Sequence, residues 1–69
     1  MKERTREHEG FTMTAVPRQD DAVWAIDLTI TRGKESWLIS AGEQAVLDDE
    51  AFEYCFSFGK DVIERELKG

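Results

Sequence analysis

Hydrophobicity alternates with a period of two from about Ala22 to Thr31, and this pattern constrains the fold more than any other feature of the chain. Successive side chains of a β-strand point to opposite faces of a sheet, so the period predicts a long strand. Arg32-Gly33-Lys34-Glu35 follows, and glycine readily takes the positive φ that a two-residue hairpin turn requires. We therefore predict a hairpin with Gly33-Lys34 as its turn. The apolar face of its first strand carries Trp24, Ile26, Leu28 and Ile30.

The turn also decides which residues of the two strands lie opposite each other. On the apolar face the predicted pairs are Ile30–Trp37, Leu28–Ile39 and Ile26–Ala41. On the other face they are Thr31–Ser36, Thr29–Leu38 and Asp27–Ser40. A shift by one residue would move Trp37 to the solvent face, so the hydrophobic pattern and the turn select one register independently.

Segments on either side of this hairpin complete the predicted sheet. Phe11–Val16 alternates in the same way and is typical of a half-buried strand, while Pro17–Asp21 has the composition of a turn. Gly42-Glu43 indicates a bulge or a turn, after which Gln44–Leu47 either continues the strand or forms a further short one. Residues 1–10 carry charges of both signs with little to bury, and we predict a flexible arm there.

The last segment has the pattern of a helix, with Asp48 or Asp49 as its N-cap and Arg65 and Lys68 near its C-terminal end. At about 100° per residue, one broad stripe of this helix is apolar and would cover the apolar face of the sheet. The stripe consists of Phe52, Cys55, Phe56, Gly59, Val62, Ile63 and Leu67. Glycine costs roughly 1 kcal/mol against alanine within a helix, so Gly59 predicts a close approach to a bulky side chain such as a tryptophan.

Together these elements predict an α+β fold of order β-β-β-α, in which a three-stranded antiparallel meander packs one face against a single C-terminal helix. Residues 11–69 would form a single domain, because a chain of 69 residues builds only one core. The other face of the sheet is expected to be polar and exposed. It would carry Thr12, Thr14, Thr29, Thr31, Ser36 and Ser40.

Few residues have the chemistry for catalysis or metal binding. The single cysteine, Cys55, cannot close an intramolecular disulfide, and with a single histidine, His8, there is no Cys/His cluster at zinc-ligand spacing. Cys55 lies on the apolar stripe and is expected in the core, and His8 is expected in the arm. The carboxylate pairs Asp20-Asp21 and Asp48-Asp49 suit a turn and a helix cap. We therefore predict no catalytic residue, metal site or cofactor, and a protein that is not an enzyme.

The formal net charge of −6 bears on partners and location. It opposes binding to nucleic acid and to anionic membranes, because both rest on Lys and Arg. Trp24 and Trp37 share the face that the helix covers, so we expect both in the core rather than on a base-stacking surface. The first ten residues lack the apolar stretch of a secretory signal, and no run approaches the roughly 18 apolar residues of a membrane span. With one unpaired thiol, a cytoplasmic location is expected.

Several short segments resemble a group of stand-alone, uncharacterised bacterial proteins of β-β-β-α order, a domain of unknown function. The resemblance covers about residues 10 to 66 and implies the fold but no activity. It rests on the Gly10-Phe11 strand start, the strand that bears Trp24, the acidic run Leu47-Asp48-Asp49-Glu50-Ala51 and the helical run Gly59-Lys60-Asp61-Val62-Ile63.

One margin of the predicted helix offers a candidate partner-binding surface. It is formed by Ala51, Tyr54, Phe58 and Val62. The hypothesis is a non-enzymatic protein-interaction module that forms a homodimer there or binds another protein, with an exposed sheet edge as a second route to dimers. Within one chain, the arm or Gln44–Leu47 could cover the same margin instead. The alternative function is an acidic inhibitor or nucleic-acid mimic that engages a basic protein surface.

Overall fold

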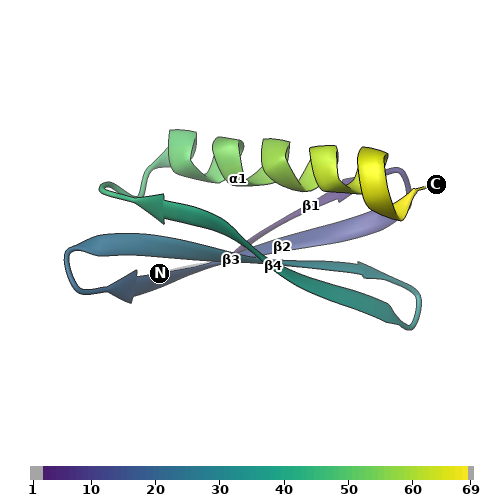
Figure 1. The fold of residues 1–69 in the computed structure, drawn as a ribbon, viewed down its shortest axis with the longest axis horizontal. Helices are drawn as coiled ribbons and strands as arrows, with labels where there is room; N and C mark the ends of the chain where they lie inside the picture. The colour runs from purple at the N-terminus through teal and green to yellow at the C-terminus, as the bar shows by residue number, and fades with distance from the viewer. Residues whose placement is uncertain (1–2, 69) are drawn as a thin grey trace.

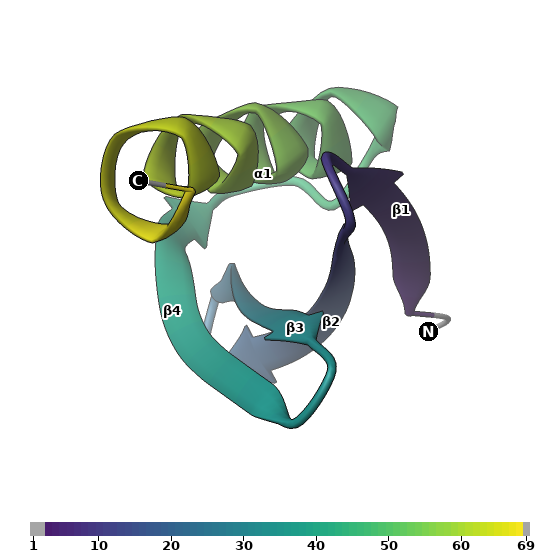
Figure 2. The same cartoon turned by 90° about the vertical axis from the view of Figure 1, so that its right-hand side faces the viewer.

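A computed structural model describes residues 3–68 of the chain. Four strands form one antiparallel sheet in the order β1-β2-β3-β4, and a helix follows them (Figure 1). The sheet is strongly twisted and curved, and the helix lies in its concave side between the two edge strands, β1 and β4 (Figure 2). The elements are β1 (Arg4–His8), β2 (Phe11–Asp20), β3 (Val23–Arg32), β4 (Glu35–Gln44), α1 (Asp49–Val62) and a π-helical turn (Ile63–Leu67).

The α+β class and the single C-terminal helix are confirmed, but the sheet has four strands rather than three. The missed strand, β1, lies within the segment that we predicted to be a flexible arm. Its alternate residues Arg4, Arg6 and His8 pair with Ala15, Met13 and Phe11 of β2, and they therefore share the concave face with the core. The side chains of β1 alternate between the two faces of the sheet, but those on the core side are charged or polar rather than apolar, so the alternation was not recognised as a strand. The part of the predicted arm at residues 1 and 2 lies outside the described residues.

Strand β2 is longer than predicted. It continues through Pro17 to Asp20, where the sequence predicted a turn, and the reversal occurs at Asp21-Ala22, with Asp21 at φ +55°. Proline lacks the N–H that a central strand donates to its neighbour, and this loss is tolerated at a sheet edge. Within residues 3–68, β1 pairs with Phe11–Ala15 and does not reach Pro17, so β2 is an edge strand there. The short partner strand explains why the proline does not end β2.

The predicted hairpin between β3 and β4 is confirmed. Its ladder pairs Ile30 with Trp37 and Leu28 with Ile39, and Gly33 in the turn has φ +58°. The predicted pairs on the polar face are also present: Thr31–Ser36, Thr29–Leu38 and Asp27–Ser40.

Beyond this stretch the ladder of β3 and β4 is irregular. Asp27 pairs with Ser40, but Ala25 pairs with Glu43, so two residues of β4 lie opposite Ile26. The predicted one-to-one Ile26–Ala41 pair is not formed, because a β-bulge places both Ala41 and Gly42 opposite Ile26. The prediction of a bulge or turn near Gly42 holds as a bulge, and β4 ends at Gln44.

The core lies between the concave face of the sheet and α1. Its fully buried large side chains are Phe11, Met13, Ile26, Leu28, Ile30, Cys55, Phe56 and Ile63. Trp37 is half-buried against this core, with its ring centroid 6.0 Å from that of Phe11. Trp24 is half-buried and lies opposite Gln19 and Gln44, so the prediction that it is a core residue is wrong. It stands beyond the bulge, at the far end of β3.

Residues of α1 meet the sheet as the apolar stripe predicts. Asp48 is the N-cap, its Oδ1 accepting a hydrogen bond from the backbone N–H of Ala51 at 3.0 Å. A Cβ atom on Gly59 would lie 2.5 Å from Cδ2 of Leu28 and 2.8 Å from Sδ of Met13. The bulky neighbour predicted for Gly59 is therefore Leu28, not a tryptophan.

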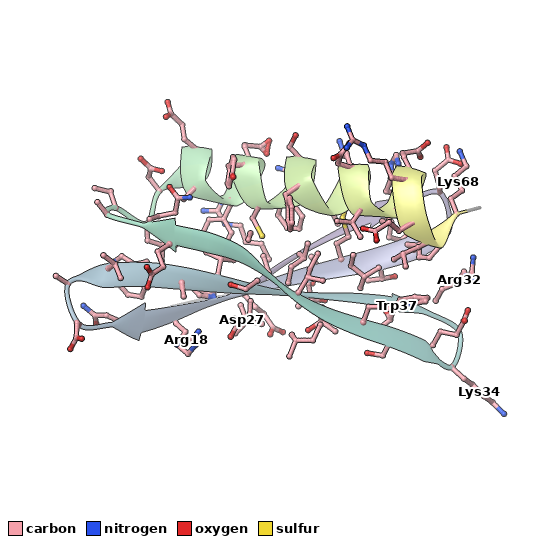
Figure 3. All side chains as sticks on the ribbon, in the orientation of Figure 1. Arg18, Asp27, Arg32, Lys34, Trp37 and Lys68 are labelled. Atoms are coloured by element: carbon pink, nitrogen blue, oxygen red, sulfur yellow. The ribbon has the colours of Figure 1, made fainter. Side chains whose placement is uncertain are left out.

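The convex face of the sheet is polar, as predicted, and faces away from α1. Arg18 and Asp27 lie together on it, with Nε and Oδ2 3.3 Å apart (Figure 3). The threonine rows of β2 and β3 are half-exposed on the same face. Val16 of β2 and Leu38 of β4 are apolar exceptions on this face, 39% and 73% exposed.

Candidate interaction surface

One flank of α1 is joined to β1 by charged side chains. Arg4 lies over the ring of Phe52 at 4.1 Å and Arg6 over that of Phe56 at 4.7 Å. An exposed ion pair contributes little by itself, but these guanidinium groups also cover aromatic rings of the core. The flank facing β1 is therefore closed. The three ion pairs, with N···O distances of 2.8, 2.5 and 2.9 Å, are Arg4–Asp49, Arg6–Glu53 and His8–Glu64.

These contacts change the ionisation of their partners. Hydrogen bonding between Arg6 and Glu53 raises the pKa of the guanidinium and lowers the pKa of the carboxyl group. The pKa of Glu64 is lowered, first by its hydrogen bond with His8 and then by Lys68. Hydrogen bonds to Glu9 and Glu64 raise the pKa of Lys68. The bonds therefore favour the charged forms of all four groups.

Protonation of Glu64 is expected to account for part of the loss of folding stability at acid pH. A carboxyl group whose pKa is lowered by folding stabilises the fold above its unfolded pKa, and this contribution is lost as the pH falls through the folded pKa. For Glu64 the loss is expected below its ordinary value of 4.5. In thermal unfolding at several pH values, Glu64→Gln should lower the Tm at pH above about 5 and should converge with the wild type in acid. Glu66→Gln is the control, and an equal pH dependence for both variants would contradict the role of Glu64.

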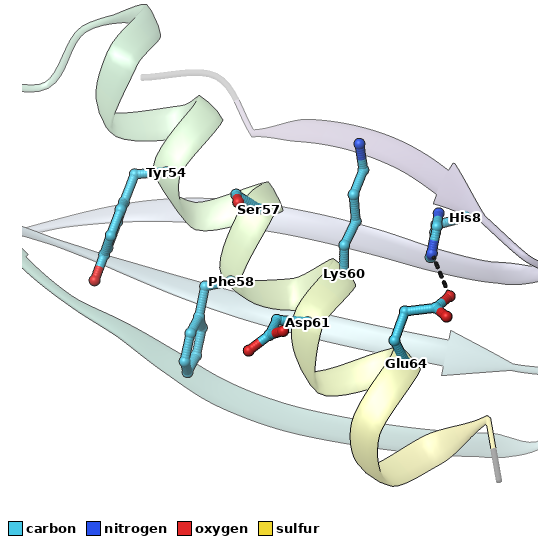
Figure 4. A pocket seen from close by; sticks show the side chains of 7 residues that line it. All are labelled: His8, Tyr54, Ser57, Phe58, Lys60, Asp61 and Glu64. Carbon is cyan, nitrogen blue, oxygen red and sulfur yellow. Dashed lines mark hydrogen bonds and ion pairs between the residues drawn. The ribbon is translucent and has the colours of Figure 1, made fainter.

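The opposite flank of α1 faces β4 and carries the predicted partner-binding residues. Tyr54 and Phe58 point toward the β4 side and are 56% and 37% exposed (Figure 4). Ala51 is buried, and Val62 is half-buried against the core. The structure thus leaves two of the four predicted residues, Tyr54 and Phe58, accessible to a partner.

The segment after β4 lies beside Tyr54 and extends the exposed apolar surface. Val46 is 64% exposed, and it lines a shallow depression together with Ala45, Ala51 and Tyr54. A second shallow depression lies on the outer side of α1 and includes Tyr54 and Phe58 (Figure 4). We call Val46, Tyr54 and Phe58 the apolar strip. The described part of the predicted arm does not cover it, because β1 lies on the other flank of α1.

Strand β4 forms the edge of the sheet beside this strip. Its residues Ser36–Ala41 include no charged residue and no proline. Within residues 3–68, Leu38 is the most exposed of the large hydrophobic side chains. The sequence placed Leu38 correctly opposite Thr29 on the exposed face but did not identify it as a site. The site could have been predicted, because Leu38 is an apolar residue between Ser36 and Ser40 on the face of the strand that was predicted to be polar.

Other candidate groups have structural partners. Cys55 is buried, and burial raises its pKa to about 11, which suits packing rather than nucleophilic attack. At the start of α1, Asp48 caps the helix and Asp49 binds Arg4. In the described part of the chain, no group of three or more His, Cys, Asp or Glu side chains is arranged to hold a metal ion. No helix within residues 3–68 has the length and apolar character needed to cross a membrane.

Comparison of the chain with protein-family models, curated proteins and solved structures finds no match. The resemblance to short bacterial proteins of β-β-β-α order therefore stays a prediction.

Proposed function

We propose that this chain is a small, non-enzymatic protein-interaction module that self-associates as a homodimer through the apolar strip. The observation that carries the proposal is the difference between the two flanks of α1. The flank toward β1 is closed by three ion pairs and two arginine–aromatic contacts. The flank toward β4 presents Tyr54 and Phe58, with Val46 beside them. Exposed aromatic side chains next to apolar ones are typical of protein interfaces.

A second copy of the chain is the partner that the charge distribution favours. Two molecules of net charge −6 repel each other, so they can approach closely only where their surfaces are neutral. The three residues of the apolar strip carry no charge, and neither does the middle of β4. A domain of 69 residues also gains from area buried in a dimer, since a single small core gives little stability.

The alternative function, an acidic inhibitor or nucleic-acid mimic, depends on carboxylates that are available to a basic partner. Its motivation was the acidic start of the helix, where Asp48 binds the helix N-terminus and Asp49 binds Arg4. Intrachain contacts thus occupy two of the three carboxylates there. This arrangement supports self-association over the acidic mimic.

Phe58→Glu is expected to convert a wild-type dimer into a monomer. The substitution places one added carboxylate from each chain in the apolar contact, where burial without a partner is costly. Light scattering and sedimentation at micromolar concentration measure the change. Ser57→Glu is the matched control, because it adds the same charge to the same helix one residue away, at an exposed position.

Two outcomes would contradict the proposal. A wild type that is monomeric throughout the micromolar range has no dimer to explain. A dimer that survives Phe58→Glu, or that Ser57→Glu disrupts equally, does not use the apolar strip. The salt dependence of binding distinguishes self-association from the alternative function. Binding of an acidic mimic to a basic partner would weaken steeply as the salt concentration increases, whereas apolar association would not.

A further inference from the structure

The two edges of the sheet differ in their protection against pairing with another strand. Edge strands in soluble proteins are protected by being short, by charges, by proline or by bulges. Strand β1 has five residues, and three of its side chains are held in ion pairs, two with α1 and one with the π-helical turn that follows it. Strand β4 has ten residues, with an uncharged stretch at Ser36–Ala41 and a bulge only near its end. The edge of β4 is therefore open to a further strand.

The hairpin turn determines which backbone groups of β4 are unpaired. Arg32 and Glu35 flank a two-residue turn, so they exchange both of their hydrogen bonds. Hydrogen-bonded pairs alternate along an antiparallel ladder, so Trp37 and Ile39 bond to β3 in the same way. The residues between them direct their N–H and C=O groups away from β3. These are Ser36, Leu38 and Ser40.

A second copy of β4 matches this edge in an antiparallel arrangement. The two-fold axis is then perpendicular to the sheet, so the two convex faces lie on the same side. The residue of β4 at the axis must lie opposite the same residue of the second copy. Centring the contact on the uncharged stretch leaves two choices, Leu38 or Ile39. With Ile39 at the centre, the exposed Leu38 lies opposite the polar Ser40 of the other chain, so no apolar contact forms on the convex face. With Leu38 at the centre, Leu38 meets Leu38 on the convex face and Trp37 lies opposite Ile39.

Charges at the two ends of β4 are complementary in this arrangement. Lys34 projects from the turn (Figure 3), and Glu43 shares the convex face with Ser40, since their partners Ala25 and Asp27 lie on one face of β3. Among the described residues, neither Lys34 nor Glu43 forms an ion pair. Pairing centred on Leu38 brings Lys34 of each chain beside Glu43 of the other. Two attractive pairs then flank an uncharged centre.

We infer that the dimer forms by antiparallel pairing of β4 with β4 of a second copy, centred on Leu38, to give one continuous eight-stranded sheet. The inference rests on the proposed self-association and adds its geometry. Because the axis is perpendicular to the sheet, both helices lie on the same side, with the flanks that bear Tyr54 and Phe58 toward the axis. The helix flank that bears Tyr54 and Phe58 thus lies on the same side of the molecule as the edge of β4.

Disulfide trapping of the full chain tests this register. Opposed residues of a hydrogen-bonded antiparallel pair have Cα atoms about 5.5 Å apart, within the range of a disulfide. Leu38→Cys should therefore form a linked dimer under mild oxidation with copper phenanthroline. Ser40→Cys is the matched control on the same face, and its two copies would be about 14 Å apart, so linkage should be about tenfold slower. The native thiol of Cys55 is buried and does not compete.

Leu38→Lys gives a second measurement without a new thiol. It places two ammonium groups opposite each other and should raise the dissociation constant of the dimer about a hundredfold. The melting temperature of the monomer should not change, because Leu38 is 73% exposed. Thr5→Lys, at an exposed position on β1, should leave the dimer intact.

The outcomes separate the register from self-association itself. A monomeric wild type would overturn both proposals. A wild-type dimer that is dissociated by Phe58→Glu, but in which Leu38→Cys links no faster than Ser40→Cys, would overturn the edge pairing and leave the proposed function standing. Faster linkage of Ile39→Cys than of Leu38→Cys would also overturn the register.

Discussion

Replacing Phe56 with alanine is expected to lower the free energy of unfolding by about 3 to 5 kcal/mol. The Phe56 ring is 1% exposed, lies in the core and is covered on one side by the guanidinium of Arg6. Its removal leaves a cavity between α1 and the sheet and also removes the arginine–aromatic contact. Small domains have total stabilities near the lower end of about 5 to 15 kcal/mol, so the variant should be largely unfolded or close to it. Equilibrium unfolding in urea measures the loss.

Phe58→Ala is the matched control for Phe56→Ala. The same truncation is made two residues along the same helix, but at a side chain that is 37% exposed. At concentrations low enough to keep the chain monomeric, its cost should be markedly smaller, since less area is lost and no closed cavity forms. Equal losses for the two variants would show that Phe56 does not occupy the core.

The second large effect is expected at the contact between Gly59 and Leu28. Leu28→Ala should cost about 2 to 5 kcal/mol, because the side chain is fully buried. Gly59→Ala alone should also destabilise the chain, since overpacking costs about 1 to 3 kcal/mol and alanine returns only about 1 kcal/mol of helix propensity. The added Cβ would lie 2.5 Å from Cδ2 of Leu28. Leu28→Ala removes Cδ2 and should therefore remove most of the overpacking cost of Gly59→Ala.

A double-mutant cycle measures this coupling. In the Leu28→Ala background, Gly59→Ala should become neutral or stabilising, because the remaining neighbour is the flexible thioether of Met13. Residues in contact give interaction energies of about 0.5 to 3 kcal/mol. Ser57→Ala, at an exposed position of α1, should add to Leu28→Ala without coupling. If Gly59→Ala costs the same in both backgrounds, Leu28 is not the side chain that requires glycine.

Elements with an apolar period were predicted correctly from the sequence, and elements held by charge were not. The register around Leu28–Ile39 was selected by both the turn and the hydrophobic pattern, and it is confirmed. Strand β1 was missed because Arg4 and Arg6 occupy the positions where a buried strand would carry apolar residues. The bulge was anticipated near Gly42, but its effect on the pairing of Ile26 was not, because a bulge changes the register only where two strands meet.

The helix margin was predicted more completely than the rest of the candidate site. Helical periodicity placed Tyr54 and Phe58 on the flank that the structure leaves exposed. The predicted surface also included Ala51, which is buried in the structure. Periodicity gives the direction of a side chain around the helix axis, but it does not show how far the curved sheet extends to cover that side chain. Val46 lies in an irregular segment without a period, so the direction of its side chain could not be predicted.

The ion pairs between β1 and α1 also bear on the order in which the molecule assembles. They join residues that are 45 and 56 positions apart in the chain, whereas the hairpins close over a few residues. Contacts between distant segments carry the larger loop-closure cost, so β1 can bind the helix only after the other strands have brought α1 into place. These contacts are electrostatic and exposed, so salt and acid weaken them first. The contacts between β1 and the helix are therefore expected to form late and to weaken first, while β1 stays paired with β2.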